Sequence, residues 1–159
     1  MSTQAIAGAA AGAALLGGGG TLAAYAAGAF EKEPVNTYKT QVLADDTVKT
    51  KEYIGDSTEK IKKHLEGDKN PKYSDTLKGV WDDMADDAKK TMQKPSEEKD
   101  NLFSESNLTS KKGEISNFVN KWCEATSRET LQEKPSNETS PEGKKWKAFK
   151  DACFYKAST

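Results

Sequence analysis

The sequence predicts a mainly α-helical protein, in which one N-terminal transmembrane helix precedes a small bundle of three to five helices. Three observations support this fold class. The first 30 residues carry no charged side chain, whereas Glu31 to Thr159 carry all of them. Several later segments repeat apolar residues at spacings of three and four, which is the period of an amphipathic helix. The roughly 130 residues after the uncharged part have the length of one small domain.

The uncharged segment, residues 5–30, begins at Ala5, ends at Phe30 and consists mainly of Ala and Gly. A helix of about 20 apolar residues crosses a bilayer, so this segment is long enough to anchor the chain in a membrane. Its small side chains and the four glycines at 17–20 weaken that prediction. A cleaved signal peptide and a low-complexity tail are the alternatives, although residues 1–4 lack the basic group of a signal peptide.

The orientation of this anchor depends on the charges that flank it. Lys32, Lys39 and Lys49 follow the segment, and no basic residue precedes it. The positive-inside rule would therefore keep the C-terminal domain in the cytoplasm. The cysteines described next favour the opposite side, with the domain outside the cell.

Cys123 and Cys153 are the two cysteines of the chain. In an oxidising compartment they can form a disulfide that closes a loop of about 31 residues, which would contribute about 3 to 4 kcal/mol. The alternative is a pair of buried thiols that act as small apolar groups. A metal site is not expected, because His64 is the one histidine and the sequence contains no CxxC motif.

The charge balance excludes some partners. The 24 basic and 25 acidic side chains give a net charge of −1, and Arg128 is the one basic residue that is not lysine. Nucleic-acid binding usually needs a positive field and arginine forks, so no nucleic-acid partner is expected. The expected partners are the lipid bilayer and an unidentified protein. No cofactor and no small-molecule substrate is evident.

The domain is predicted to occupy residues 41–159, after a linker at 31–40 in which Pro34 interrupts any helix. Residues 41–54 fit a helix only loosely, and 47–50 could be extended. Residues 56–67 fit a helix better, because Asp56 and Glu59 have capping-box spacing and Gly67 can end it. His64 is predicted to lie on the surface of this helix, before a turn at 68–71.

Residues 74–92 form the strongest predicted helix, with Ser74 as its cap and Pro95 beyond its end. Its apolar stripe is predicted to face the core, and its aspartates are predicted to face solvent. The stripe comprises Leu77, Val80, Trp81, Met84, Ala88 and Met92, and the aspartates are Asp82, Asp83, Asp86 and Asp87.

A loop with at most one helical turn is predicted at 96–110, followed by a helix at 111–126 and a polar connection at 127–140. The last helix begins at Pro141 with Ser140 as its cap. The helical spacing places Cys123 and Cys153 on apolar faces of the last two helices, which are predicted to be antiparallel neighbours. That arrangement would allow the disulfide.

The layout resembles a known group of proteins. An uncharged Ala/Gly segment precedes a Lys-rich helical domain that carries Trp122, Cys123 and, near the end, Cys153. In these features the chain resembles the paralogous, uncharacterised membrane-associated proteins of haemotropic mycoplasmas. The resemblance implies membrane association and surface exposure, with a role in host interaction or antigenic variation. It brings no catalytic residues with it.

No motif in the sequence identifies a reaction. It lacks a Gly-rich phosphate loop, a nucleophile elbow and paired carboxylates with an evident pocket. We therefore expect a non-enzymatic, single-pass protein of the cell membrane whose domain is displayed outside the cell, for host interaction or antigenic presentation. A membrane-anchored cytoplasmic scaffold or accessory subunit is the alternative, and an enzyme without a recognisable motif is a remote one.

Overall fold

The computed structural model describes residues 36–67, 70–85 and 92–156. The chain divides into two compact units, Met1–Lys32 and Glu33–Thr159, and the described residues belong to the second. The predicted anchor at 5–30 lies outside them. In the described part of the chain no helix is both long enough and apolar enough to cross a membrane.

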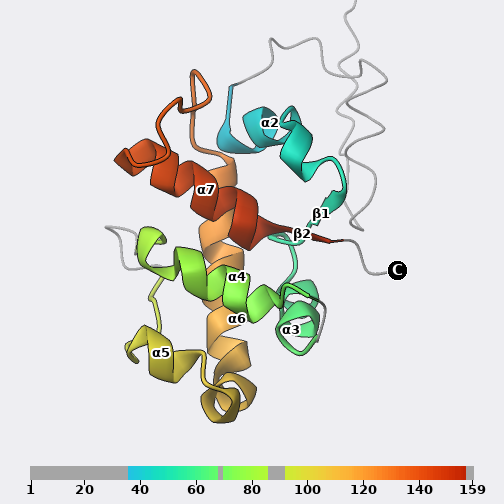
Figure 1. Ribbon diagram of the computed structural model, residues 1–159, viewed down its shortest axis with the longest axis vertical. Helices are drawn as coiled ribbons and strands as arrows, with labels where there is room; N and C mark the ends of the chain where they lie inside the picture. Colours follow the sequence, from blue (N-terminus) through green and yellow to red (C-terminus); the bar gives the residue numbers. More distant parts are fainter. Residues whose placement is uncertain (1–35, 68–69, 86–91, 157–159) are drawn as a thin grey trace, which may run out of the picture. The chain divides into compact units, whose positions relative to one another are not determined.

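The described residues are mainly helical, as predicted, and contain six α-helices instead of three to five (Figure 1). Two 3₁₀-helices and two short strands complete the set. In chain order the elements are α2 (Tyr38–Leu43), η1 (Asp46–Val48), β1 (Lys51–Tyr53), α3 (Thr58–Leu65), α4 (Tyr73–Val80), η2 (Trp81–Asp83), α5 (Lys99–Leu102), α6 (Glu105–Ser127), α7 (Pro141–Cys153) and β2 (Phe154–Lys156).

Helix α6 is the longest element of the described residues, and α2, α3, α5 and α7 all contact it. Its second half has the predicted buried face, which comprises Ile115, Phe118, Val119, Trp122 and Cys123. The loop predicted at 96–110 is wrong, because α5 and the first turns of α6 lie there. Those turns are exposed apart from half-buried Leu108, so they show no apolar period that could have predicted a helix.

Helix α7 begins as predicted. The Ser140 Oγ accepts a hydrogen bond from the Gly143 backbone N–H at 3.0 Å, and Pro141 occupies the first helical position. The inner face of α7 is buried, with Trp146, Phe149, Ala152 and Cys153 turned to the core. Figure 1 shows α7 crossing α6, so the two helices are neighbours but do not lie antiparallel.

The helix predicted at 41–54 is wrong, and α2 begins within the predicted linker at 31–40. Helix α2 begins at Tyr38, which is 4% exposed, and Thr37 caps it. The chain then leaves the helix, because the Asp45 carboxylate accepts the Thr47 backbone N–H and starts η1 instead. Strand β1 follows.

The two-stranded sheet is antiparallel and joins distant parts of the chain. Lys51 of β1 pairs with Lys156 of β2, and Tyr53 pairs with Phe154. Tyr155 lies in β2, beyond the end of α7. Strands of three residues are too short for an alternating pattern to reveal them.

The helix predicted at 74–92 ends earlier than expected. Helix α4 continues only through η2, and Met84 is extended. The Lys94 ammonium donates to the Met84 carbonyl at 3.0 Å and to the Trp81 carbonyl, which satisfies the carbonyls of this helix end. Of the predicted stripe, Leu77, Val80, Trp81, Met84 and Met92 are buried.

The other residues predicted for the helix at 74–92 lie only partly within the described part of the chain. Asp82 is exposed and ion-paired with Lys99, and Asp83 is half-buried, while Asp86, Asp87 and Ala88 lie outside the described residues. The predicted cap is wrong, since Lys72 occupies the cap position without a side-chain hydrogen bond and Ser74 lies inside α4.

Helix α3 matches its predicted position but not its predicted cap. Ser57, not Asp56, caps it through a hydrogen bond from the Lys60 backbone N–H at 3.3 Å. The predicted surface position of His64 is wrong, because this side chain is only 7% exposed. Its ring lies 5.0 Å from that of Tyr155, so the returning C-terminal strand covers it.

Candidate functional site

The disulfide links the two C-terminal helices. Cys123 in α6 is bonded to Cys153 at the end of α7, with their Cα atoms 5.7 Å apart. This distance is within the normal range for a disulfide. Both cysteines are fully buried. The pair suggested by the sequence is therefore present, and it lies within the core.

The residues after β1 cover this bond. The backbone N–H groups of Ile54 and Gly55 both donate to the Cys153 carbonyl, at 2.9 and 3.3 Å. The Asn120 side-chain amide donates to the Gly55 carbonyl at 2.8 Å. A buried disulfide fixed in this way is inaccessible to attacking thiolates, which is typical of a structural bond and not of a redox-active one.

Gly55→Ala is expected to lower the free energy of unfolding by about 1 to 3 kcal/mol. A Cβ at this position would lie 2.5 Å from the Cys123 Cβ and 3.0 Å from its Sγ. The surrounding backbone is held by hydrogen bonds, so it cannot easily move away. Urea denaturation of the oxidised protein measures the effect.

Gly79→Ala is the matched control. No atom lies within 4 Å of a Cβ built at Gly79, which is exposed in α4. This substitution is expected to be neutral or to stabilise by up to about 1 kcal/mol, because Ala favours a helix. Equal losses for the two variants would contradict the close packing at Gly55.

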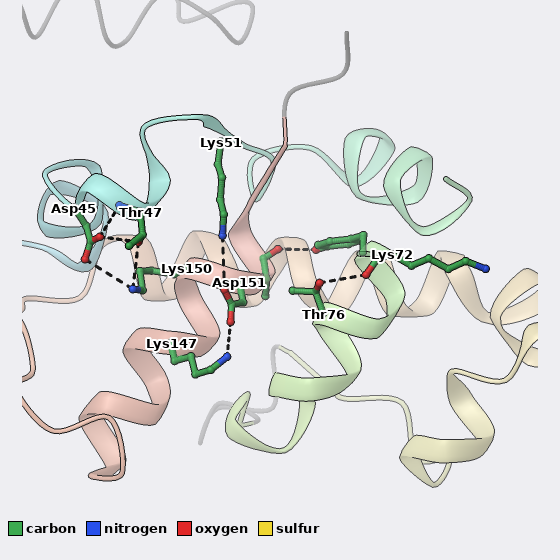
Figure 2. Close-up of polar contacts among 10 residues, drawn as sticks. Asp45, Thr47, Lys51, Lys72, Thr76, Lys147, Lys150 and Asp151 are labelled. Carbon is green, nitrogen blue, oxygen red and sulfur yellow. Dashed lines mark hydrogen bonds and ion pairs between the residues drawn. The ribbon is translucent and has the colours of Figure 1, made fainter. Parts of the chain in front are cut away.

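A network of charges connects α7 to the N-terminal elements (Figure 2). The Asp45 side chain is only 2% exposed and has the Lys134 and Lys150 ammonium groups 2.7 and 3.8 Å away. The Thr47 hydroxyl donates to the other Asp45 oxygen at 2.6 Å. Asp45 therefore connects the turn after α2 with α7 and with the connection that precedes α7.

A second group in the network joins β1 to α7. The Asp151 carboxylate lies 2.5 Å from the Lys147 ammonium and 3.7 Å from that of Lys51, which extends from β1 in Figure 2. These side chains are partly exposed, and ion pairs of this kind contribute about 0 to 1 kcal/mol each. They help to define how α7 docks but contribute little to stability.

The electrostatics of Asp45 do not suit acid or base catalysis near neutral pH. Hydrogen bonds from Lys134 and then from Thr47 hold the pKa of the Asp45 carboxyl well below its usual range. The hydrogen bond to Asp45 likewise raises the pKa of Lys134, so that its amine remains charged. A weak base beside a protonated amine supplies neither proton transfer nor a nucleophile. The network is best explained as a structural clamp.

Asp45→Asn is expected to lower the free energy of unfolding at pH 7 by about 1 to 3 kcal/mol. Asparagine retains an acceptor for the Thr47 backbone N–H but removes the attraction to Lys134 and Lys150. The effect depends on pH, because the folded-state pKa of Asp45 is lowered. Its contribution is complete above the unfolded-state pKa of about 3.9 and declines as the pH falls toward the folded-state pKa.

Urea denaturation at pH 7 and pH 3 measures this dependence. The difference between the wild type and Asp45→Asn should shrink at pH 3. Asp46→Asn is the control, because Asp46 pairs on the surface with Lys49 and both side chains are exposed. A difference for Asp45→Asn that does not change with pH would contradict the lowered pKa.

Buried tyrosines surround the chain where α7 passes into β2. The Tyr73 hydroxyl donates to the Ala152 carbonyl at 2.5 Å, and the Tyr155 hydroxyl donates to the Pro71 carbonyl. Burial raises the pKa of Tyr73, and it raises the pKa of Tyr53 to about 12. These phenols remain protonated at neutral pH and act as hydrogen-bond donors within the fold.

The polar features of this region were partly visible in the sequence. Asp45 two residues before Thr47 is the pattern of an Asx turn, which could have predicted the end of α2. Lys134 and Lys150 gave no such signal, because tertiary folding alone brings them to Asp45. Among the described residues no group of three or more His, Cys, Asp or Glu side chains is arranged to hold a metal ion.

No family model, curated protein or solved structure matches this chain.

Proposed function

We propose that this chain is a single-pass membrane protein that displays a disulfide-bonded helical domain outside the cell and has no enzymatic activity. Its displayed surface would serve host interaction or antigenic presentation. The uncharged segment at 5–30 supports the anchor. The resemblance to the paralogous membrane-associated proteins of haemotropic mycoplasmas supports the same assignment.

The buried disulfide carries the proposal of outward display. Disulfides form and persist in oxidising surroundings, and reducing systems in the cytoplasm keep most thiols free. Gly55 leaves no room for a Cβ beside Cys123, so the backbone there is suited to the bonded pair. A domain with such a bond in its core is best suited to an extracellular location.

Thiol alkylation followed by mass spectrometry tests this location. Protein from intact cells is denatured, because both cysteines are buried, and alkylated with and without reductant. Labels on Cys123 and Cys153 that appear only after reduction would support outward display. Labelling of both residues without reductant would contradict it.

The cytoplasmic scaffold is the second candidate, and the lysines at 32, 39 and 49 favour it through the positive-inside rule. Protease added to intact cells distinguishes the two. Loss of the domain would exclude the scaffold, whereas protection in intact cells combined with digestion after lysis would exclude display.

A further inference from the structure

The connection between α6 and α7 carries an Asn-x-Thr triplet, Asn137-Glu138-Thr139, whose middle residue is not proline. This triplet is the acceptor sequence for attachment of a sugar to an asparagine side chain in exported proteins. A second triplet, Asn107-Leu108-Thr109, lies within α6. Such triplets also arise by chance, and the surroundings of the two asparagines separate them.

The exposed Asn137 side chain is held through its oxygen only. The Asn137 Oδ1 accepts hydrogen bonds from the Thr139 backbone N–H at 2.9 Å and from the Thr139 hydroxyl at 2.7 Å. Within the part of the chain that the structure describes, the Asn137 Nδ2 group donates no hydrogen bond. The nitrogen that a sugar would join is therefore free, and the threonine hydroxyl is directed at the same amide.

The backbone of Asn137 is held against the first turn of α7. Its carbonyl accepts hydrogen bonds from the Ser140 hydroxyl at 2.7 Å and from the Ser140 backbone N–H at 3.3 Å. A Cβ at Gly143 would overlap the same carbonyl oxygen, so this glycine lets the connection lie directly on the helix. The three residues of the triplet nevertheless remain exposed. The triplet therefore has a defined position before α7 that an enzyme could reach.

The turn before α7 does not account for the amide nitrogen of Asn137. An aspartate would accept the same two hydrogen bonds from Thr139, and its charge would favour the start of a helix. Asparagine adds only the Nδ2 group, which the turn leaves unused. A sugar acceptor requires this group, whereas the turn does not.

Asn107 lacks these features. It lies in the first turn of α6, and its Nδ2 group donates to the Asn101 carbonyl at 2.9 Å. The Thr109 hydroxyl donates to the Glu105 carbonyl at 3.3 Å, and not to Asn107. Modification of Asn107 would require its hydrogen bond to break and a turn of the helix to open. It is therefore a control within the same chain.

From this contrast we propose that Asn137 is the attachment site of an N-linked glycan, transferred from a lipid-linked glycosyl diphosphate by a membrane transferase. The Asn137 Nδ2 forms a bond to C1 of the sugar, the bond from C1 to the diphosphate oxygen breaks, and the diphosphate leaves with that electron pair. A carboxylate of the transferase accepts the proton that Nδ2 loses. The hydrogen bond from the Thr139 hydroxyl polarises the amide and makes this proton easier to remove. The proposal rests on the outward display proposed above, because the transfer follows export.

Incubation of the purified, oxidised full chain with a lipid-linked oligosaccharide and an oligosaccharyltransferase tests the site without export. A single glycan is expected, at Asn137. Transfer to Asn107 should be about tenfold slower or less, because its hydrogen bond must break and α6 must open locally. Glycopeptide mass spectrometry locates the sugar. Equal rates at the two asparagines, or no glycan on Asn137, would overturn the proposal.

Variants with a matched control separate the acceptor from the turn. Asn137→Asp retains the oxygen that accepts from Thr139, so it should lose the glycan but denature in urea like the unglycosylated wild type. Thr139→Ala should abolish transfer, whereas Thr139→Ser, which keeps the hydroxyl, should retain it. Thr109→Ala is the control and should leave transfer to Asn137 unchanged. Transfer to Thr139→Ala at the wild-type rate, or destabilisation by Asn137→Asp, would contradict the proposal.

Protein from intact cells distinguishes this proposal from that of outward display. Glycopeptide mass spectrometry and thiol alkylation are applied to the same sample. A sugar on Asn137 together with bridged cysteines would support both proposals. Unmodified Asn137 in a chain whose cysteines are bridged would overturn the glycan alone, and unmodified Asn137 with free thiols would overturn both.

Discussion

Replacement of both Cys123 and Cys153 by alanine is expected to lower the free energy of unfolding by about 3 to 4 kcal/mol. The bond joins residues 30 apart in the sequence, so in the unfolded chain it restricts a loop of this length. Without the bond the unfolded chain regains this conformational entropy, which favours the unfolded state. For a small domain such a change is a large fraction of the total stability.

The choice of alanine matters for this measurement. Both side chains are fully buried, and serine would add two hydroxyl groups to an apolar site at a further cost. Urea denaturation of the double variant and of the oxidised wild type gives the difference. The wild type denatured with excess dithiothreitol should give nearly the value of the double variant. A loss below about 1 kcal/mol in both would contradict a structural role for the bond.

Phe149→Ala is expected to lower the free energy of unfolding by about 3 to 5 kcal/mol. Phe149 is fully buried in α7. Its ring lies 6.0 Å from that of Tyr38 and 5.8 Å from that of Phe154, and it also contacts Tyr53 and Trp122. It therefore joins α2, β1, α6 and β2 at one point, and its removal leaves a cavity that these elements cannot easily fill.

Urea denaturation again provides the measurement, with near-ultraviolet circular dichroism to report on the aromatic cluster. Leu43→Ala is the control, because Leu43 is a large apolar residue of α2 that is 37% exposed. That change should alter the free energy of unfolding by about 0.5 kcal/mol or less. A similar small effect for Phe149→Ala would mean that the cluster is not the centre of the core.

The second half of α6 and the whole of α7 could be predicted from sequence. In both segments the local helix signals and the apolar residues that enter the core indicate the same helix. Ser140 and Pro141 define the start of α7. Apolar residues such as Phe118 in α6 and Phe149 in α7 recur at the spacing of a helix. The helix at 74–92 shows the limit of this reasoning. The described residues of its apolar stripe are buried as predicted, but the stripe continues past the end of the helix, because Met84 is buried in an extended conformation.

The candidate site was harder to predict, because its residues are far apart in the sequence. Cys123 and Cys153 could be proposed as a pair because they are the two cysteines of the chain. The burial of His64 depends on Tyr155, and the clamp at Asp45 depends on Lys134. Such contacts between distant residues leave no local pattern in the sequence.

The position of Cys153 at the end of the last helix has a consequence for biogenesis. A polypeptide is synthesised, and crosses a membrane, from its N-terminus, so Cys123 would reach the far side well before its partner. Until α7 follows, β1 has no β2 to pair with, and the covalent link to α6 cannot form. Oxidation of an exported chain would therefore wait until Cys153 has followed, and Cys123 would be open to mixed disulfides during the interval.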